Sequence, residues 1–210
     1  MTEYEPGYWA NAGSSQTKCP DGREPLQYNE ACEFNIEWLS DPDADFKCIT
    51  ADNYGYRFGK PCLLLKLNRV FGWQPHPYFN IMDVDNHTTM PQDLKNHIRH
   101  EWQTALDDGE CRIDDPRCSK LNMIWLHCDG EYPVDRENLG SVKYTPWRGF
   151  PARYFPYWNQ LGYLQPVVMV QLQNPVPGVL INIQCTAWAH NIEHDISTMK
   201  GSVHIEFIMD

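Results

Sequence analysis

The eight cysteines of this 210-residue chain constrain its fold more than any other feature of the sequence. Their even number favours pairing, and no two of them have the two-residue spacing that is typical of structural zinc sites. Most lie beside turn residues, which predicts a disulfide framework formed in an oxidising compartment. Eight reduced thiols in a cytosolic protein are the less favoured alternative. The cysteines are Cys19, Cys32, Cys48, Cys62, Cys111, Cys118, Cys128 and Cys185.

Length and charge narrow the class of protein. The chain suits one large domain or two small ones, and a domain of this length buries roughly 70% of the surface of its unfolded chain. Its net charge is -11, and no basic stripe is visible. We therefore expect no nucleic-acid partner.

A second feature agrees with passage through the secretory pathway. Asn86, His87 and Thr88 form an N-glycosylation acceptor without a proline in the middle position. The sequence contains neither a signal peptide nor an apolar run long enough to span a bilayer. The expectation is that a leader was removed, or that these residues are an ectodomain separated from its membrane anchor.

Alternating apolar residues predict a mainly β fold. Leu63, Leu65 and Leu67 fall on one face of a strand that opens at Cys62. Four later segments have strand character and are separated by turn signals, which indicates an antiparallel β-sandwich. These segments are residues 120–128, 164–172, 179–188 and 203–209.

Two helices and two irregular stretches complete the predicted organisation. Residues 29–39 and 91–108 have helical spacing, and in the second of them Pro91 suits a first turn and Gly109 a stop. Residues 74–88 are interpreted as a loop. Residues 1–18 are expected to be a flexible lead-in, and residues 19–210 a single sandwich domain.

Catalytic and metal-binding patterns are weak throughout. His97, His100 and Glu101 lack the spacing of a zinc protease, so solvated helix histidines are the better interpretation. Residues 41–52 approach calcium-loop spacing, but the position that requires glycine holds Phe46. No nucleophile elbow and no phosphate-binding loop is present. We therefore predict a protein that is not an enzyme and has no cofactor and no metal site.

The segment from Gly149 to Val168 is unusually rich in aromatic residues. Two prolines within it, Pro151 and Pro156, interrupt any helix or central strand. Tyr and Trp bury an apolar body while keeping a polar tip, which suits protein interfaces. Packing of this loop over the edge of the sandwich itself remains an equal alternative.

Three stretches together resemble the beta subunits of the sodium/potassium- and proton/potassium-transporting ATPases. They are "CEFNIEWL" (32–39), "YGYRFGKPCLLLKLNRVFGW" (54–73) and "FPARYFPYWNQLGYLQPVVMVQ" (150–171). The resemblance covers residues 29–73 and 128–210, whereas residues 74–127 look closer to invertebrate members than to the vertebrate pattern.

This resemblance implies a disulfide-stapled, immunoglobulin-like antiparallel β-sandwich with one or two inserted helices. It implies a non-catalytic subunit, anchored by a segment absent here, with its ectodomain on the extracellular side of the plasma membrane. The expected partner is the catalytic alpha subunit, whose folding, delivery and potassium occlusion the beta subunit assists. Sodium/potassium specificity is favoured because that pump is widespread. The alternatives are a proton/potassium pump subunit and an adhesion ectodomain that binds another beta ectodomain in trans.

The resemblance also implies particular residues. Carried over from the family, the disulfides join Cys19 to Cys32, Cys48 to Cys62 and Cys128 to Cys185. Cys111 and Cys118 exceed the usual six cysteines of the family, and we predict a fourth, local bridge between them. The family further implies that the aromatic loop faces the alpha subunit or supports that contact. The residues assigned to it are Tyr154, Phe155, Tyr157, Trp158 and Gln165.

Overall fold

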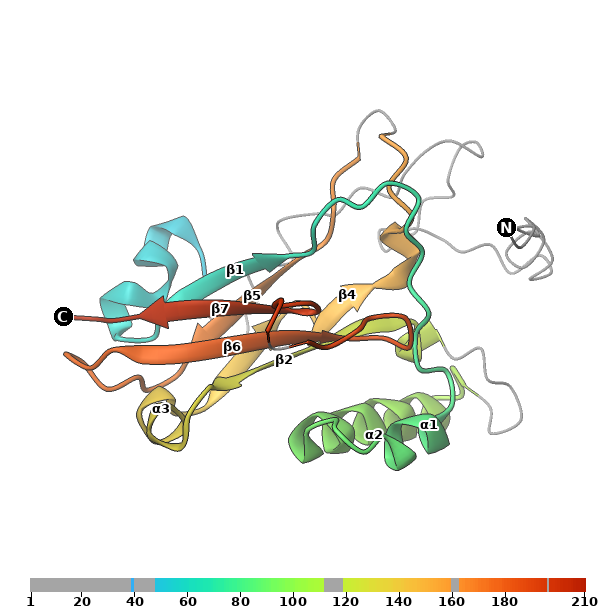
Figure 1. Cartoon of the computed structure of the whole chain (residues 1–210), viewed down its shortest axis with the longest axis horizontal. Coiled ribbons are helices and arrows are strands. Elements are labelled where there is room, and N and C mark those ends of the chain that lie inside the picture. The colour runs from blue at the N-terminus through green and yellow to red at the C-terminus, as the bar shows by residue number, and fades with distance from the viewer. Residues whose placement is uncertain (1–38, 40–47, 112–118, 160–162, 196) are drawn as a thin grey trace.

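A computed structural model describes Leu39 and residues 48–111, 119–159, 163–195 and 197–210. Two antiparallel sheets form its centre (Figure 1). The smaller sheet has the order β1 (Cys62–Lys66), β5 (Val167–Leu172) and β3 (Val142–Thr145). The larger sheet has the order β4 (Gly149–Pro151), β2 (Met123–Gly130), β6 (Ile181–Trp188) and β7 (Ser202–Phe207).

The main core lies between the two sheets. Strand β6 alternates as a half-buried strand should, because its odd-numbered residues point into this core and its even-numbered residues point outward. On β1, Leu63 and Leu65 pack against the same core, as their spacing predicts. The fully buried core residues include Ile124, Val168, Val170, Leu172, Ile181 and Ile183.

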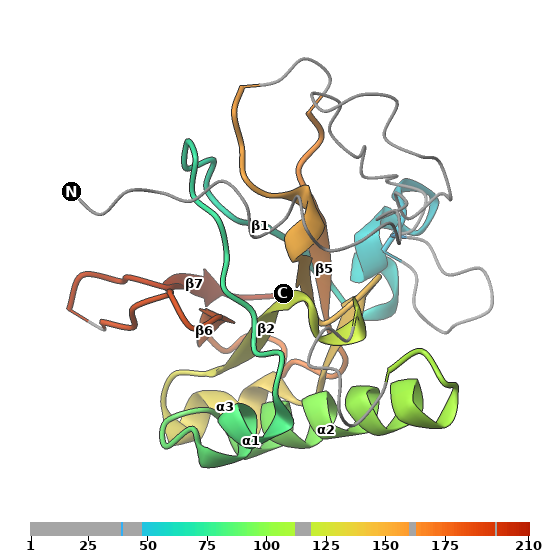
Figure 2. The ribbon, with the colours of Figure 1, turned by 90° about the vertical axis from the view of Figure 1, so that its right-hand side faces the viewer.

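Helices cover part of the outer face of the larger sheet. Figures 1 and 2 show α1 (Ile81–Asn86) and α2 (Gln92–Asp107) on the side opposite to β1 and β5. Leu94 and Ile98 of α2 are fully buried against Trp125 and Trp188 of the sheet. The helix predicted over residues 91–108 is therefore confirmed, with Pro91 immediately before it.

The interpretation of residues 74–88 as a loop is wrong at α1. Asn80 caps this short helix, since its side chain accepts a hydrogen bond from the backbone N–H of Met82. Val84 is fully buried and fixes the helix against α2. A helix of six residues is too short to produce a periodic pattern that sequence inspection detects.

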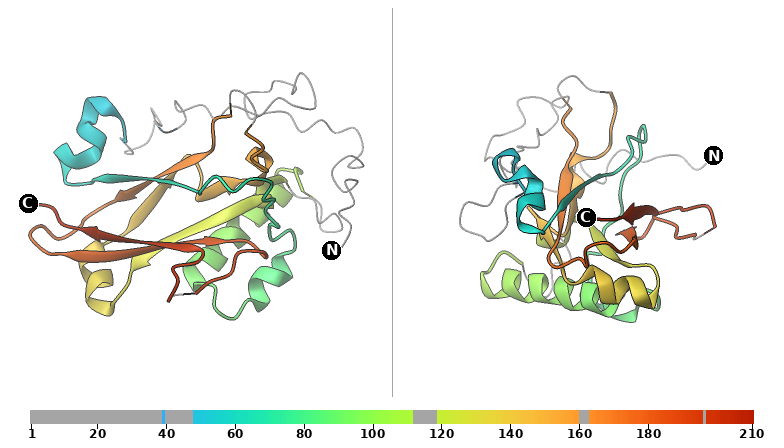
Figure 3. Two further views of the ribbon diagram at one scale, coloured as in Figure 1. Left: turned by 45° about the horizontal axis from the view of Figure 1, so that its top comes forward. Right: turned by 90° about the vertical axis from the view of Figure 1, so that its left-hand side faces the viewer.

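Three further elements have no counterpart in the prediction: α3 (Pro133–Leu139), β3 and β4. The Asp135 carboxylate fixes α3, because it accepts hydrogen bonds from the backbone N–H groups of Tyr132 and, on β6, Asn182. Between these elements, the described residues include the 3-10 segments η2 (Thr50–Phe58), η3 (Ser119–Leu121) and η4 (Ala152–Tyr154). Figure 3 shows η2 at the start of β1.

Several predicted bounds shift. The strand expected over 120–128 begins three residues later, because η3 occupies its start, and the strand expected over 164–172 begins at Val167. His97 is not a solvated histidine, since it is half-buried with its ring centroid 5.7 Å from that of Trp125. The helix expected over 29–39 lies outside the described residues except for Leu39, and the expected lead-in lies wholly outside them.

The mainly β, disulfide-stapled fold is thus confirmed, while its immunoglobulin-like detail stays a prediction.

Candidate functional site

Two disulfides are described, one at the start of the smaller sheet and one within the larger sheet. Cys62 opens β1 and is bonded to Cys48, with the two Cα atoms 5.8 Å apart. Cys128 and Cys185 face each other directly on β2 and β6, with Cα atoms 4.0 Å apart. Both bonds are the pairings that the family resemblance implies.

Of the four remaining cysteines, only Cys111 is among the described residues, and it is disulfide-bonded. Its predicted partner, Cys118, lies outside the described residues, as do Cys19 and Cys32. The local 111–118 bridge and the 19–32 bridge therefore stay predictions.

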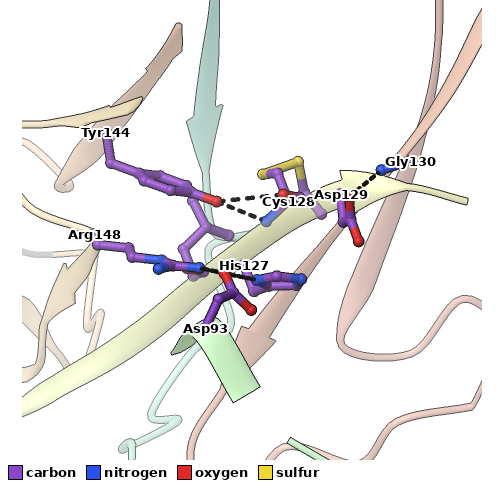
Figure 4. The surroundings of a disulfide bond; sticks show 9 residues. Asp93, His127, Cys128, Asp129, Gly130, Tyr144 and Arg148 are labelled. Atoms are coloured by element: carbon purple, nitrogen blue, oxygen red, sulfur yellow. Dashed lines mark hydrogen bonds and ion pairs between the residues drawn. A yellow bond between two sulfur atoms is a disulfide. The ribbon is translucent and has the colours of Figure 1, made fainter. Parts of the chain in front are cut away.

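A polar network surrounds the Cys128–Cys185 bond (Figure 4). The hydroxyl of Tyr144, on β3, lies 2.8 Å from the backbone nitrogen of Cys128, which donates to it. The guanidinium of Arg148 lies over the Tyr144 ring, 4.9 Å from its centroid. Its Nη2 atom donates to Asp93 at 2.7 Å and lies 2.9 Å from Nδ1 of His127, which is itself 3.3 Å from the Asp93 carboxylate. The network links the first turn of α2 to both sheets.

Charge in this network shifts two pKa values. Partial burial acts to raise the pKa of the Asp93 carboxyl, but hydrogen bonds from His127 and Arg148 and their charges outweigh it and hold the pKa well below its usual range. Burial lowers the pKa of His97, and the positive charge of Arg148 lowers it further. This region is consistent with a structural role, because its groups are satisfied by one another.

The aromatic segment divides into buried and exposed residues. Tyr154 is only 3% exposed and packs with Leu39, Cys48, Cys62 and Met169. Its side chain therefore supports the loop from inside and is not available at the surface.

The other predicted contact residues lie farther out. Phe155 packs edge to face on Trp73, with ring centroids 5.7 Å apart, and Tyr157 and Gln165 are half-buried. Trp158 is 52% exposed. Of the five residues predicted to contact the partner, Trp158 is the most exposed.

A second loop, between β1 and α1, lies against this segment. The backbone N–H of Gly72 donates to the carbonyl of Tyr157 at 2.9 Å. The Gln165 side chain donates to the carbonyl of Leu67 at 2.9 Å and accepts from Nε of Arg69 at 2.9 Å. These bonds hold the two loops in one arrangement.

Two aromatic rings meet where the loops join. Phe71 and Trp158 pack edge to face with centroids 4.9 Å apart. Gly72, which follows Phe71, has a φ of +69°. A Cβ atom at this position would lie 3.0 Å from a carbon of the Trp158 ring. Only glycine fits such a close approach with a positive φ.

We call the four exposed apolar residues of these two loops the loop surface. Val70 is 52% exposed, Phe71 66%, Trp158 52% and Leu164 50%. Phe71 and Trp158 are in contact, and exposed apolar groups that cluster in this way are typical of protein-interaction sites. Sequence reasoning missed Val70 and Phe71, although both stand in the "NRVFGW" part of the motif that indicated the family.

Asn86, the glycosylation acceptor, is exposed at the last position of α1. Among the described residues, no three His, Cys, Asp or Glu side chains are placed to hold a metal ion. The described part of the chain also contains no helix with the length and apolar character needed to cross a membrane.

A family model described as "Sodium / potassium ATPase beta chain" matches residues 8–205. A similar protein is sodium/potassium-transporting ATPase subunit beta-2 of Drosophila melanogaster, which is 38% identical over 205 residues. Subunit beta-1 of the same organism is 35% identical over 200 residues, and subunit beta-1 of Tetronarce californica is 28% identical over 197 residues.

These matches cover 98%, 94% and 88% of this chain but 57%, 56% and 54% of the respective relatives. The chain thus spans about half the length of the curated relatives that it matches.

Proposed function

The chain belongs to the sodium/potassium ATPase beta chain family, and we propose that it is the ectodomain of a non-catalytic beta subunit of a sodium/potassium pump. In this role it assists the folding, membrane delivery and potassium occlusion of a catalytic alpha subunit. The observation that carries the proposal is the family match over residues 8–205, which includes both described disulfides. A relative named as a pump beta subunit is 38% identical over nearly the whole chain.

The proposed subunit does no chemistry of its own. ATP hydrolysis and ion transport belong to the alpha subunit in this family, whereas the relatives of this chain are named as beta subunits. The proposed location is the extracellular side of the plasma membrane, with an anchor outside these 210 residues. The disulfides support an oxidising compartment.

We place the alpha contact on the loop surface. Its four residues are exposed in the described structure, yet hydrogen bonds from Gly72, Arg69 and Gln165 fix the loops that carry them. A contact surface that is already ordered loses little conformational entropy on binding, which favours affinity. Phe71 and Trp158 are the expected anchors, since aromatic residues dominate the energetics of many interfaces.

We also propose that Asn86 carries an N-linked glycan. The asparagine is exposed, and it ends a helix in a protein that we assign to the secretory pathway.

The test is co-expression of the full-length anchored protein with an alpha subunit in eukaryotic cells. Membranes are solubilised, the beta chain is captured, and recovered alpha and cardiac-glycoside-sensitive ATP hydrolysis are measured. We expect recovery of active alpha, reduced by at least about tenfold in the Phe71→Ala/Trp158→Ala variant, which corresponds to 1.4 kcal/mol of binding.

Leu64→Ala is the matched control, because Leu64 is 54% exposed on β1 outside the loop surface. A folded protein that reaches the cell surface and never recovers alpha would refute the proposed function. Equal recovery by the double variant and the control would refute only the placement of the contact.

A further inference from the structure

Two histidine rings join the outer helices to the larger sheet. We call α1 and α2 together the helix layer (Figure 2). His87, the residue that follows α1, packs edge to face on Trp188 with ring centroids 5.4 Å apart, and His97 of α2 packs in the same way on Trp125 at 5.7 Å. The two indoles are opposite one another on β6 and β2 and are 5% and 2% exposed. Two titratable rings therefore lie at the buried junction between the helix layer and the sheet.

The surroundings of His87 disfavour a positive charge. Lys95 of α2 is 9% exposed, and its ammonium group donates to a backbone carbonyl of α1 at 3.1 Å, so a fixed positive charge faces this helix. His194, on the segment after β6, packs on Trp188 with ring centroids 4.2 Å apart. Burial lowers the pKa of His87, and the charges of His194, Lys95 and His190 lower it further.

The carboxylates of α1 are paired with other groups. Asp83 lies 3.6 Å from Nε2 of His190, and Asp85 bonds to Arg99 of α2 at 2.7 Å. Among the described residues, no carboxylate forms an ion pair with His87. Protonation of His87 would therefore place an uncompensated charge beside a buried indole.

Positive charge also faces His97, which is half-buried. The guanidinium of Arg148 bonds to Asp93 in the first turn of α2, and His127 of β2 lies 3.3 Å from the same carboxylate (Figure 4). Burial is the largest cause that lowers the pKa of His97, and the charge of Arg148 lowers it further. Other charged groups around this ring have smaller effects; they are His100, which lowers the pKa, and Glu101 and Asp93, which raise it.

Some other histidines of the molecule have acidic partners. Nδ1 of His204 lies 2.8 Å from Glu131, and the ring of His190 lies 3.6 Å from Asp83. An adjacent carboxylate stabilises a protonated ring, so acidification strengthens such contacts. His87 and His97 respond in the opposite sense, because burial and neighbouring cations favour their neutral rings.

The pH dependence follows from these directions. When the junction is open, each ring has the ordinary histidine pKa of 6.5, and when it is closed the pKa is lower. The open state therefore binds more protons, and acid favours it. Attachment of the helix layer is complete above pH 6.5 and weakens as the pH falls through 6.5 toward the values of the closed state.

We propose that the helix layer is an acid-sensitive element, fixed to the sheet outside the cell and locally open in acidified secretory or endocytic compartments at about pH 5 to 6. Opening separates His87 and His97 from the two indoles. The main core between the sheets stays closed, since it is apolar and contains the Cys128–Cys185 bond. Only the cellular setting is taken from the proposed function; the response to acid is a property of the fold and does not depend on the alpha contact.

Hydrogen exchange of the purified full-length protein tests the proposal. Exchange is followed by peptide mass at about pH 7.4 and about pH 5.5, and each rate is divided by the intrinsic rate of the unfolded peptide at that pH. We expect protection of the helix layer (81–107) to fall at least about fivefold in acid, the lower end of typical coupling between a bound effector and a conformational equilibrium. Protection of β5, which is paired on both sides, should stay unchanged.

His87→Phe/His97→Phe keeps a flat ring against each indole and removes its titration. In this variant the acid-dependent fall should disappear. His100→Phe is the matched control, because His100 is an exposed residue of the same helix, and it should keep the fall. Equal falls in the two variants would overturn the proposal. Unchanged or increased protection of the parent protein in acid would also overturn it, because attraction between a protonated ring and an indole would then be the stronger effect.

A second measurement does not require the variants to fold. Ring resonances of the histidines in the parent protein are followed by NMR as the pH is lowered, and those of His87 and His97 are identified by their proximity to the Trp188 and Trp125 indoles. We expect both rings to take up their protons below pH 6.5, over the same range in which the helix layer loses protection. Protonation of both rings at or above pH 6.5, with the helix layer still protected, would overturn the proposal.

Discussion

Two aromatic-rich regions of this molecule have similar residue types and opposite burial. Under α1 and α2, Tyr78, Trp125 and Trp188 are each at most 5% exposed. On the loop surface, Phe71 and Trp158 are more than half exposed, although hydrogen bonds order the loops beneath them. The difference indicates that the first region stabilises the fold and the second is free to bind a partner.

The largest expected effect on stability comes from the helix-covered region. Trp125→Ala removes a side chain that is 2% exposed. We expect the free energy of unfolding to fall by about 3 to 5 kcal/mol, because a large cavity replaces packed contacts. Urea unfolding of the purified protein measures the loss. A change below about 1 kcal/mol, the level of an ordinary surface substitution, would remove the contrast between the two regions.

The two described disulfides come next. Cys128→Ala/Cys185→Ala opens a sequence separation of 57 residues, and Cys48→Ala/Cys62→Ala one of 14. By the loop-entropy model the first change costs about 4 kcal/mol and the second about 3 kcal/mol. The urea midpoints of the two double variants test this order, provided that both variants have the same dependence of unfolding free energy on urea concentration. The reverse order would show that native-state packing around Cys48 and Cys62 outweighs loop entropy.

A smaller effect is expected from the network that fixes α2 to the sheets. The pKa of Asp93 is lowered in the folded protein, so its contribution to stability is present above the unfolded value of 3.8 and is lost as the pH falls through that value toward the folded one. Since the Asp93 side chain is 59% exposed, the contribution is at most about 1 kcal/mol.

Asp93→Asn tests this assignment, because it keeps the shape of the side chain and removes its charge. The variant should be less stable than the parent at pH 7, and the difference should shrink between pH 5 and pH 3. Unfolding midpoints across this range give the answer, and a difference that grows on acidification would contradict the assigned role of Asp93.

The smallest effect on stability is expected on the loop surface. Phe71→Ala/Trp158→Ala should change the free energy of unfolding by less than about 1 kcal/mol, since both side chains are more than half exposed. The same variant should lose alpha recovery, whereas Trp125→Ala should lose it only in proportion to its folded fraction. Unfolding midpoints and alpha recovery measured on the same preparations separate the two roles. A large loss of stability in the loop variant would contradict this separation, because it would show that the loop surface also stabilises the fold.

The sequence predicted the elements that have long periodic patterns. Leu94 and Ile98 lie on the buried face of α2, and burial alternates along β6 from Ile181 to Ala187. It did not predict α1, α3, β3 or β4, which have seven residues or fewer and depend on caps and cross-strand bonds. Asn80 and Asp135 can be seen in the sequence, but the groups to which their side chains hydrogen-bond cannot be predicted from it.

The candidate site was predictable in part. The aromatic segment and Trp158 could be identified from composition alone. Burial of Tyr154 could not, because it depends on Cys48, Cys62 and Met169, which are distant in sequence. Phe71 was missed for the same reason, since only the fold brings it to Trp158.

Photo-crosslinking tests most directly whether the loop surface binds the alpha subunit. A benzophenone amino acid replaces Phe71, Trp158 or Leu64 in the anchored protein, which is co-expressed with alpha, irradiated and analysed for crosslinked pairs. Covalent alpha–beta products from positions 71 and 158, and none from position 64, are the predicted result. Crosslinks from position 64 alone, or none from 71 and 158 in a complex that still purifies intact, would contradict the account.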